Sequence, residues 1–260
     1  MSSESLVLVT REGGLTTVML NRPEALNALS MALRNRIAEV FDEIASDGQT
    51  EVVILSGAGR AFTVGLDLKE LGGEVDATAQ ASSRDLSAAI GALNVPIIGA
   101  VNGFAITGGF ELALMCDFLI ASPEARFADT HARVGVVPGW GLSQRLPRLI
   151  GINRAKELSL TGNYLDAETA ERWGLVNRIV PADELISTCE KLAQDILSTD
   201  PATRSEIRRI MDAGWHSTLS EGLATELEAT RAHDKATKPA QQVAARRKNI
   251  QDRGRAQSGD

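Results

Sequence analysis

The chain has 260 residues, of which 43% are hydrophobic and 23% are charged, enough for one large core with a helical appendage. Its net charge is −7 and only 4% of its residues are aromatic, so the composition offers no electrostatic case for binding nucleic acid. Two cysteines without metal-ligand spacing, no long apolar run and no signal-peptide pattern predict a cytoplasmic protein with no structural metal and no membrane segment.

The first hundred residues alternate between strand and helix patterns. Leu6–Thr10 and Leu15–Leu20 flank Gly13-Gly14, which predicts a β-hairpin. Ser30 is a candidate cap for a helix over residues 31–46, where apolar side chains recur at helical spacing. The other elements predicted in this part are buried strands over 51–56 and 96–101, a mobile loop over 72–83 and a helix over 84–94.

The second half changes from a mixed pattern to a purely helical one. Short strands are predicted over 117–121, 125–128 and 174–180, and helices over 182–198, 202–213, 218–232 and 238–250. Alternating strands and helices followed by helices alone predict an α/β body with a helical C-terminal part. We place a catalytic core at 1–195 and a C-terminal helical region, used for packing or oligomerisation, at 196–260.

The stretch NGFAITGGFELALMC, residues 102–116, carries the chemistry most clearly. A strand runs into Gly108-Gly109, and a helix opens with Glu111 in its first turn. Free N–H groups at a helix start, aided by the helix dipole, can hold a developing oxyanion, and a carboxylate one turn away can move a proton. The same residues also fit a tightly packed turn with an exposed charge, so this stretch alone leaves both interpretations open.

Four segments together carry a resemblance: NRPEALNAL (21–29), GAGRAFTVGLDLKEL (57–71), GGFE (108–111) and FADTHARVGVVPGWGLSQRL (127–146). In this order and spacing they resemble the crotonase family, also called the enoyl-CoA hydratase/isomerase family, over roughly residues 5–250. The resemblance implies a crotonase-like spiral of ββα units in the α/β class, with C-terminal helices packing on the body or on a neighbour. It also implies a homotrimer or a dimer of trimers.

By matching positions, the resemblance also implies a site for an acyl-CoA thioester. The N–H groups of Leu66 and Gly108 would form the oxyanion hole. Coenzyme A is part of the substrate, so no further cofactor and no metal are expected. The residues expected near the adenine end of coenzyme A are Ala25, Leu26, Val64, Asp67 and Leu68, with Lys69 as a phosphate neighbour.

The chain departs from the family pattern at one catalytic position. Glu111 matches the first of two glutamates that family hydratases use, but His131 stands where the second is expected. Asp129 and Thr130 are polar alternatives nearby. Imidazole exchanges protons near neutral pH, so a Glu/His pair could activate water; a structural histidine beside the pocket is the other interpretation. Trp140 either shapes the acyl pocket or packs in the core.

These observations favour an enzyme that adds water to a 2-enoyl-CoA through an oxyanion-stabilised enolate, a lyase of fatty acid or other lipid metabolism. Glu111 would be the general acid/base, and His131 would position or activate water. An alternative is a Δ3-Δ2 enoyl-CoA isomerase that uses Glu111 as its single base. An alternative of another class is a non-catalytic acyl-CoA binder, because fold alone does not determine function.

Overall fold

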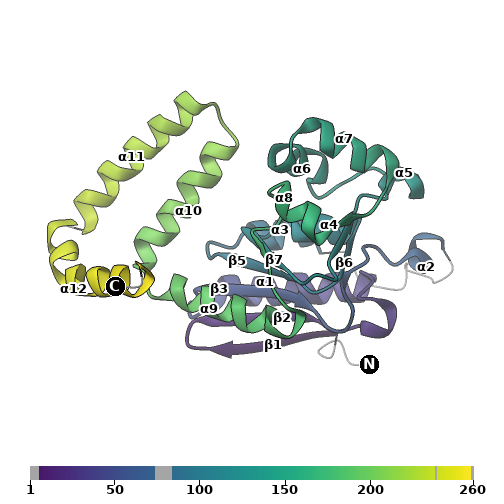
Figure 1. Ribbon diagram of the computed structural model, residues 1–260, viewed down its shortest axis with the longest axis horizontal. Coiled ribbons are helices and arrows are strands. Elements are labelled where there is room, and N and C mark those ends of the chain that lie inside the picture. The colour runs from purple at the N-terminus through teal and green to yellow at the C-terminus, as the bar shows by residue number, and fades with distance from the viewer. Residues whose placement is uncertain (1–5, 74–83, 238, 259–260) are drawn as a thin grey trace. The chain divides into compact units, whose positions relative to one another are not determined.

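The structure, a computed structural model, describes residues 6–73, 84–237 and 239–258. It divides into two units, Met1–Ser198 and Thr199–Asp260 (Figure 1). The first unit mixes strands and helices, and the second contains only helices in its described part. This agrees with the α/β body and helical C-terminal part expected from the sequence. The contact boundary follows the end of helix α9 (Leu185–Leu197).

A six-stranded sheet forms the base of the first unit. Its strands, in spatial order, are β1 (Val7–Glu12), β2 (Leu15–Leu20), β3 (Val52–Gly57), β5 (Ile97–Val101), β7 (Phe118–Ala121) and β10 (Arg178–Ile179). β1 and β2 form the predicted antiparallel hairpin, and the other pairings are parallel. The strand predicted over 174–180 shortens to two residues, because Gly174 adopts a φ of 81° and turns the chain.

A second, four-stranded sheet explains how the chain spirals. It consists of β4 (Ala61–Thr63), β6 (Phe104–Ile106), β8 (Arg126–Ala128) and β9 (Leu165–Asp166) in that order. Each of the pairs β3–β4, β5–β6 and β7–β8 therefore contributes its first strand to the large sheet and its second to the small one. The sequence analysis did not predict β4 or β6, which have only three residues each.

The helices of the first unit close these turns. Ser30 caps the first of them by accepting a hydrogen bond from the N–H of Leu33 at 3.2 Å, as predicted. The helix predicted over 84–94 is shorter, and most of the loop predicted over 72–83 lies outside the described residues. The helices are α1 (Met31–Asp47), α2 (Leu68–Leu71), α3 (Leu86–Gly91), α4 (Gly108–Ala113), α5 (His131–Val134), α6 (Leu142–Ile150), α7 (Ile152–Thr161), α8 (Ala167–Arg172) and α9.

The central strands of the large sheet, β3 and β5, are buried on both faces, as the unbroken apolar run of β3 predicts. Val53 and Leu55 point into the main core, whereas Val52 and Ile54 face a second cluster with Cys189 of α9. Side chains alternate between the faces of a strand, and each fully buried aliphatic side chain contributes roughly 1.5–3 kcal/mol. This two-sided burial makes the large sheet a rigid base for the segments that follow its strands.

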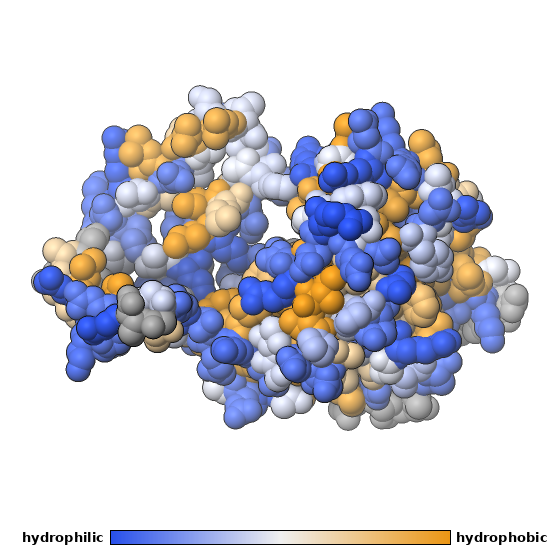
Figure 2. Space-filling view, in the orientation of Figure 1, coloured by the Kyte–Doolittle hydropathy of each residue, from blue (hydrophilic) through white to orange (hydrophobic). Residues whose placement is uncertain are grey.

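The C-terminal unit consists of α10 (Pro201–Trp215), α11 (Leu219–Thr237) and α12 (Pro239–Ser258). Asp200 caps α10 through the N–H of Thr203 and forms an ion pair with Arg246 at 2.9 Å. Figure 2 shows hydrophobic side chains on the surface of this unit; the large exposed ones are Ile207, Met211, Trp215, Leu219, Leu223, Leu227, Val243 and Ile250. Among the described residues, no helix is long and apolar enough to cross a membrane.

Candidate active site

A cavity of about 830 Å³ is lined by residues of the loop before α1, of α2, and of the first turns of α4 and α5. Every site residue proposed from the sequence borders it. They are Ala25, Leu26, Val64, Leu66, Asp67, Leu68, Gly108, Glu111, His131 and Trp140, together with Lys69. Segments that are more than a hundred residues apart in the sequence therefore meet at one site, which is large enough for a drug-sized ligand.

The loop before α1 forms one wall and is held by polar side chains. The guanidinium of Arg22 contacts the carboxylate of Asp67 at 2.6 Å. Asn27 is fully buried, and its amide donates to three backbone carbonyls, including that of Ala61 at 2.8 Å. Burial favours the neutral acid of Asp67, but Arg22 and backbone N–H groups outweigh this and hold its pKa below the usual value. The carboxylate of Asp67 thus binds Arg22 in this wall and also caps α2 by accepting the N–H of Lys69.

The backbones of two residues that border the cavity, Leu66 and Gly108, lie close together. A bridge to Leu29 uses the carbonyl of Gly65 and the N–H of Asp67, so the N–H of Leu66 between them faces the opposite way. Gly108 is the first residue of α4, and its N–H has no partner inside the helix. A Cβ built on Gly108 would lie 3.6 Å from the nitrogen of Leu66. The geometry therefore suits two donors on one oxygen.

The approach of α4 to this position depends on unusual backbone. Thr107, the residue before α4, has φ 55° and ψ −112°, a conformation that non-glycine residues rarely adopt. At Gly109, a Cβ would lie 2.1 Å from the carbonyl oxygen of Thr63 in β4. Only glycine allows the helix start to lie this close to the small sheet. The strain and the close contact together orient the first turn of α4 toward the cavity.

The carboxylate of Glu111 is almost fully buried, with 3% of the residue exposed. Its Oε1 accepts the backbone N–H of Trp140 at 2.7 Å and, more weakly, that of Leu142 at 3.4 Å. These donors hold one carboxylate oxygen and leave Oε2 directed toward His131, at 3.5 Å from its Nε2. The side chain is thereby fixed in one orientation, with a single oxygen available for proton transfer.

His131 lies between two carboxylates. Its Nδ1 contacts Oδ1 of Asp129 at 2.6 Å, its Nε2 faces Glu111, and only 6% of His131 and 1% of Asp129 are exposed. Burial disfavours the charged ring, but the hydrogen bonds and negative charges of Asp129 and Glu111 outweigh it and raise the pKa of His131 to about 9. At neutral pH the ring is therefore an imidazolium, which donates at both nitrogens.

Asp129 is itself held in its charged form. Burial favours its neutral acid, but hydrogen bonds from His131 and from Ser159 of α7, with the charge of His131, outweigh this and lower its pKa. Asp129 and Glu111 are the charged side chains that contribute most to the shift of His131. The site thus contains a buried row of charges, Asp129 negative, His131 positive and Glu111 as the second carboxylate.

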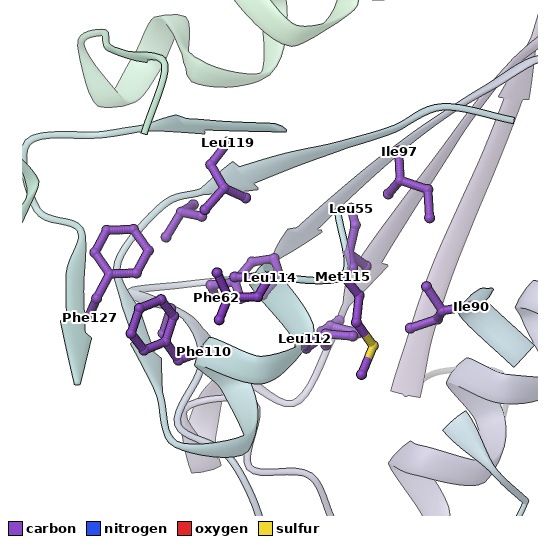
Figure 3. Packing of buried hydrophobic residues seen from close by; sticks show 14 of the residues in the cluster. Leu55, Phe62, Ile90, Ile97, Phe110, Leu112, Leu114, Met115, Leu119 and Phe127 are labelled. Atoms are coloured by element: carbon purple, nitrogen blue, oxygen red, sulfur yellow. The ribbon is translucent and has the colours of Figure 1, made fainter. Parts of the chain in front are cut away.

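The starts of α4 and α5 are tied together on both sides. The hydroxyls of Thr107 and Thr130 contact each other at the two helix starts. In the core, Phe110 packs against Phe127, with ring centroids 5.4 Å apart (Figure 3). Phe110 directly precedes Glu111 and Phe127 lies four residues before His131, so the packing of the two rings in Figure 3 supports the segments that carry both site residues.

Sequence reasoning missed several of these contacts. Asp129 was considered as an alternative to His131, whereas the structure places its carboxylate against the ring of His131. The proposed role of Trp140 concerned its side chain, but its backbone N–H holds Glu111. The contact between Trp140 and Glu111 joins segments 29 residues apart, whereas that between Asp129 and His131 is local and depends on the turn that starts α5. In the described ranges, no group of three or more His, Cys, Asp or Glu is arranged to hold a metal ion.

Comparisons with known proteins agree with this architecture. The profile of the enoyl-CoA hydratase/isomerase family matches residues 10–250. A probable peroxisomal enoyl-CoA hydratase 1 of Arabidopsis thaliana is 41% identical over 232 residues, 89% of this chain and 87% of that protein. An enoyl-CoA hydratase structure from Bacillus anthracis superposes with a TM-score of 0.84 at 33% identity, covering 94% of this chain and 96% of that one. A monofunctional enoyl-CoA isomerase from M. smegmatis gives 0.72 at 36% identity, covering 84% and 97%.

Proposed function

We propose that this chain, which belongs to the enoyl-CoA hydratase/isomerase family, adds water across the C2–C3 double bond of a 2-enoyl-CoA. The observation that carries the proposal is the pair of proton-transfer groups, Glu111 and His131, whose facing atoms are 3.5 Å apart beside two backbone donors. Hydration needs one group to take a proton from water and another to give a proton to C2, and the site offers one of each.

Glu111 is the base of the proposed reaction. Its Oε2, which no backbone N–H group holds, takes a proton from water while the water oxygen bonds to C3, and the electrons of the double bond move toward the thioester. The resulting negative charge lies on the thioester oxygen, where the N–H groups of Leu66 and Gly108 stabilise it. Removing one such donor typically costs roughly 10²–10³ in rate.

His131 is the acid. Its imidazolium gives the Nε2 proton to C2 as the thioester carbonyl re-forms, which completes the addition of one water. This leaves Glu111 protonated and His131 neutral, and transfer of the proton from Oε2 to Nε2 across the pair restores the starting state. Because the pKa of His131 is raised to about 9, the ring donates at neutral pH, a different role from the water activation expected from its ordinary pKa.

Asp129 would support this reaction without touching the substrate. Its carboxylate fixes the ring of His131 and stabilises the charge that the ring carries in the resting state. Isomerisation requires only one group, which removes a proton at one carbon and returns it at another. A buried donor beside Glu111 has no use in that scheme, and this favours hydration over the isomerase alternative.

Two further proposals concern the position of coenzyme A and the oligomeric state. We propose that the adenine end of coenzyme A lies along Ala25, Leu26, Val64 and Leu68, which border the open cavity. The exposed apolar side chains of the C-terminal unit support a homotrimer or a dimer of trimers. The cytoplasmic location and the lack of any further cofactor remain predictions.

Product analysis by mass spectrometry tests the reaction. Purified protein would be incubated separately with 2-butenoyl-CoA and 3-butenoyl-CoA. We expect the first to gain the mass of one water and the His131→Ala variant to lose most of this activity. Conversion of the 3-enoyl substrate to an isobaric 2-enoyl product, retained in His131→Ala, would support the isomerase instead. Tight binding of both thioesters without turnover would support the acyl-CoA binder.

A further inference from the structure

A second, smaller chamber adjoins the site. It has a volume of about 370 Å³, and Arg34, Gly139 and Trp140 border both it and the main cavity. The residues expected near coenzyme A border only the main cavity. Because the backbone N–H of Trp140 binds Glu111, this chamber begins next to the reacting end of the site.

Arg34 borders this chamber, and no described residue accepts a hydrogen bond from it or forms an ion pair with it. Its Nε is buried and has no hydrogen-bond acceptor, and no described carboxylate lies within ion-pair distance of its guanidinium. Burial lowers its pKa, and the nearest negative charge, Glu70, only partly offsets this. The carboxylate of Glu70 is already used by the backbone N–H of Met31 at 2.8 Å. Arg34 is only partly buried, but its Nε is shielded and lacks an acceptor, which a carboxylate entering the chamber could supply.

The position of Arg34 in its helix adds to this cost. Arg34 lies in the first turn of α1, where the helix dipole disfavours a positive charge. The other arginine of the chamber, Arg84, is paired with Asp42 at 2.6 Å, and Asp85 caps α3 through the N–H of Ala88. Arg34 is therefore the cation of this chamber that the described residues leave without a bonded partner, and it borders the substrate cavity.

We propose that Arg34 binds a carboxylate at the far end of the acyl group, so that the preferred substrates are 2-enoyl-CoA thioesters of dicarboxylic acids. The proposal rests on the hydratase function proposed above. A guanidinium matches a carboxylate in charge and in its paired donor geometry. A phosphate of coenzyme A offers similar chemistry, but none of the positions expected for coenzyme A borders the second chamber.

The test compares matched substrates in wild type and in Arg34→Met, which keeps the length of the side chain and removes its charge. The substrates are 2-butenoyl-CoA, 2-enoyl-CoA thioesters with a terminal carboxylate and five, six or seven acyl carbons, and the methyl ester of each acid. We expect wild type to prefer at least one acid over its ester. Arg34→Met should lower kcat/KM for that acid by about 10-fold to 100-fold while leaving 2-butenoyl-CoA and the esters almost unchanged.

Two further variants separate the binding of a carboxylate from general damage. Arg148, an exposed residue of α6 that contacts only Gln144 of its own helix in the described structure, is the matched control, and Arg148→Met should change no substrate. Arg34→Lys keeps the charge but loses the paired donors, so it should retain part of the preference for the acid. Circular dichroism and thermal unfolding would show whether each variant is folded.

The possible failures are distinguishable. Equal losses on acids, esters and 2-butenoyl-CoA in a folded Arg34→Met variant would overturn the proposal, as would a wild type that hydrates the esters as well as the acids. A weaker inhibition by free coenzyme A in Arg34→Met would assign the arginine to a phosphate and also overturn it. If wild type hydrated neither 2-butenoyl-CoA nor any of the acids, the hydratase function itself would be overturned.

Discussion

The first turns of α4 and α5 meet at the same cavity, but different groups hold them. In α4, backbone groups supply the contacts. Gly108 offers its N–H, and the N–H groups of Trp140 and Leu142 bind the carboxylate of Glu111. At the start of α5, a side chain supplies the contact, because the carboxylate of Asp129 orients the ring of His131 and favours its protonated form. Backbone contacts survive most substitutions, whereas the charge of His131 depends on two side-chain carboxylates, with Asp129 contributing more than Glu111. The hydrogen bonds at the first turn of α4 thus tolerate most side-chain changes, whereas the protonation state of His131 at the start of α5 depends on particular side chains.

Glu111→Gln should cause the largest loss of activity, because Glu111 is the base of the proposed reaction. The amide oxygen can still accept the N–H of Trp140, so the fold should be retained, but the group no longer takes a proton from water. We expect kcat for hydration to fall by about 10²–10⁴-fold. Steady-state kinetics with 2-butenoyl-CoA would measure this, and full activity in the variant would contradict the assignment of the base.

Gly109→Ala tests the backbone side of the comparison. The new Cβ would lie 2.1 Å from the carbonyl oxygen of Thr63, so α4 must move and displace the N–H of Gly108. We expect kcat to fall by roughly 10²–10³-fold and the free energy of unfolding to fall by about 1–3 kcal/mol.

Gly91→Ala is the matched control, because it lies in α3 with nothing within 4 Å of its added Cβ. It should leave both quantities nearly unchanged, measured by the same kinetics and by urea unfolding. If the two variants behaved alike, the close approach of α4 would not be needed for the oxyanion hole.

Asp129→Asn tests the side-chain half. The neutral amide no longer favours the charged ring, so the pKa of His131 should fall by about 1–2 units. In wild type the acid form is present below a pKa of about 9 and is lost as the pH rises through it. The fall of kcat/KM at high pH should therefore begin at lower pH in the variant. A purely structural role for Asp129 would lower activity equally at every pH and leave the shape of the profile unchanged.

Leu66→Ala should have the smallest effect on the reaction, because the donor at this position is a backbone N–H. The side chain is only partly buried against the main core, so its truncation should cost less than the roughly 2–5 kcal/mol of a fully buried leucine. We expect kcat to stay close to wild type in an assay at saturating 2-butenoyl-CoA. A loss as large as that of Gly109→Ala would mean that the side chain, and not the backbone, shapes the oxyanion hole.

The same contrast explains what the sequence could predict. Hydrophobic periodicity and capping predicted the N-terminal hairpin, α1 and the buried strands β3 and β5, because each has a strong local pattern. The three-residue strands β4 and β6 are too short to show a pattern. The motifs placed the α4 turn and the position of His131, and the family resemblance is confirmed by the match over residues 10–250.

The contacts that define the chemistry could not be predicted in the same way. The pair Glu111–His131 and the position of Arg34 depend on how loops and helix starts converge in space. An arginine in the first turn of an amphipathic helix is expected at the surface from the sequence alone. The raised pKa of His131 likewise comes from two carboxylates, one of them 20 positions away in the chain. Such properties follow from tertiary structure and have no local signal.

An NMR titration of the histidine ring carbons tests the central claim most directly, since the chain has only three histidines. A His131→Gln sample identifies the signal of His131 by its absence. The account predicts that His131 stays protonated through neutral pH and titrates near 9, and that Asp129→Asn moves this titration downward. A His131 signal that titrates below 7 in wild type would contradict the account, because the ring could not then be the resident proton donor beside Glu111.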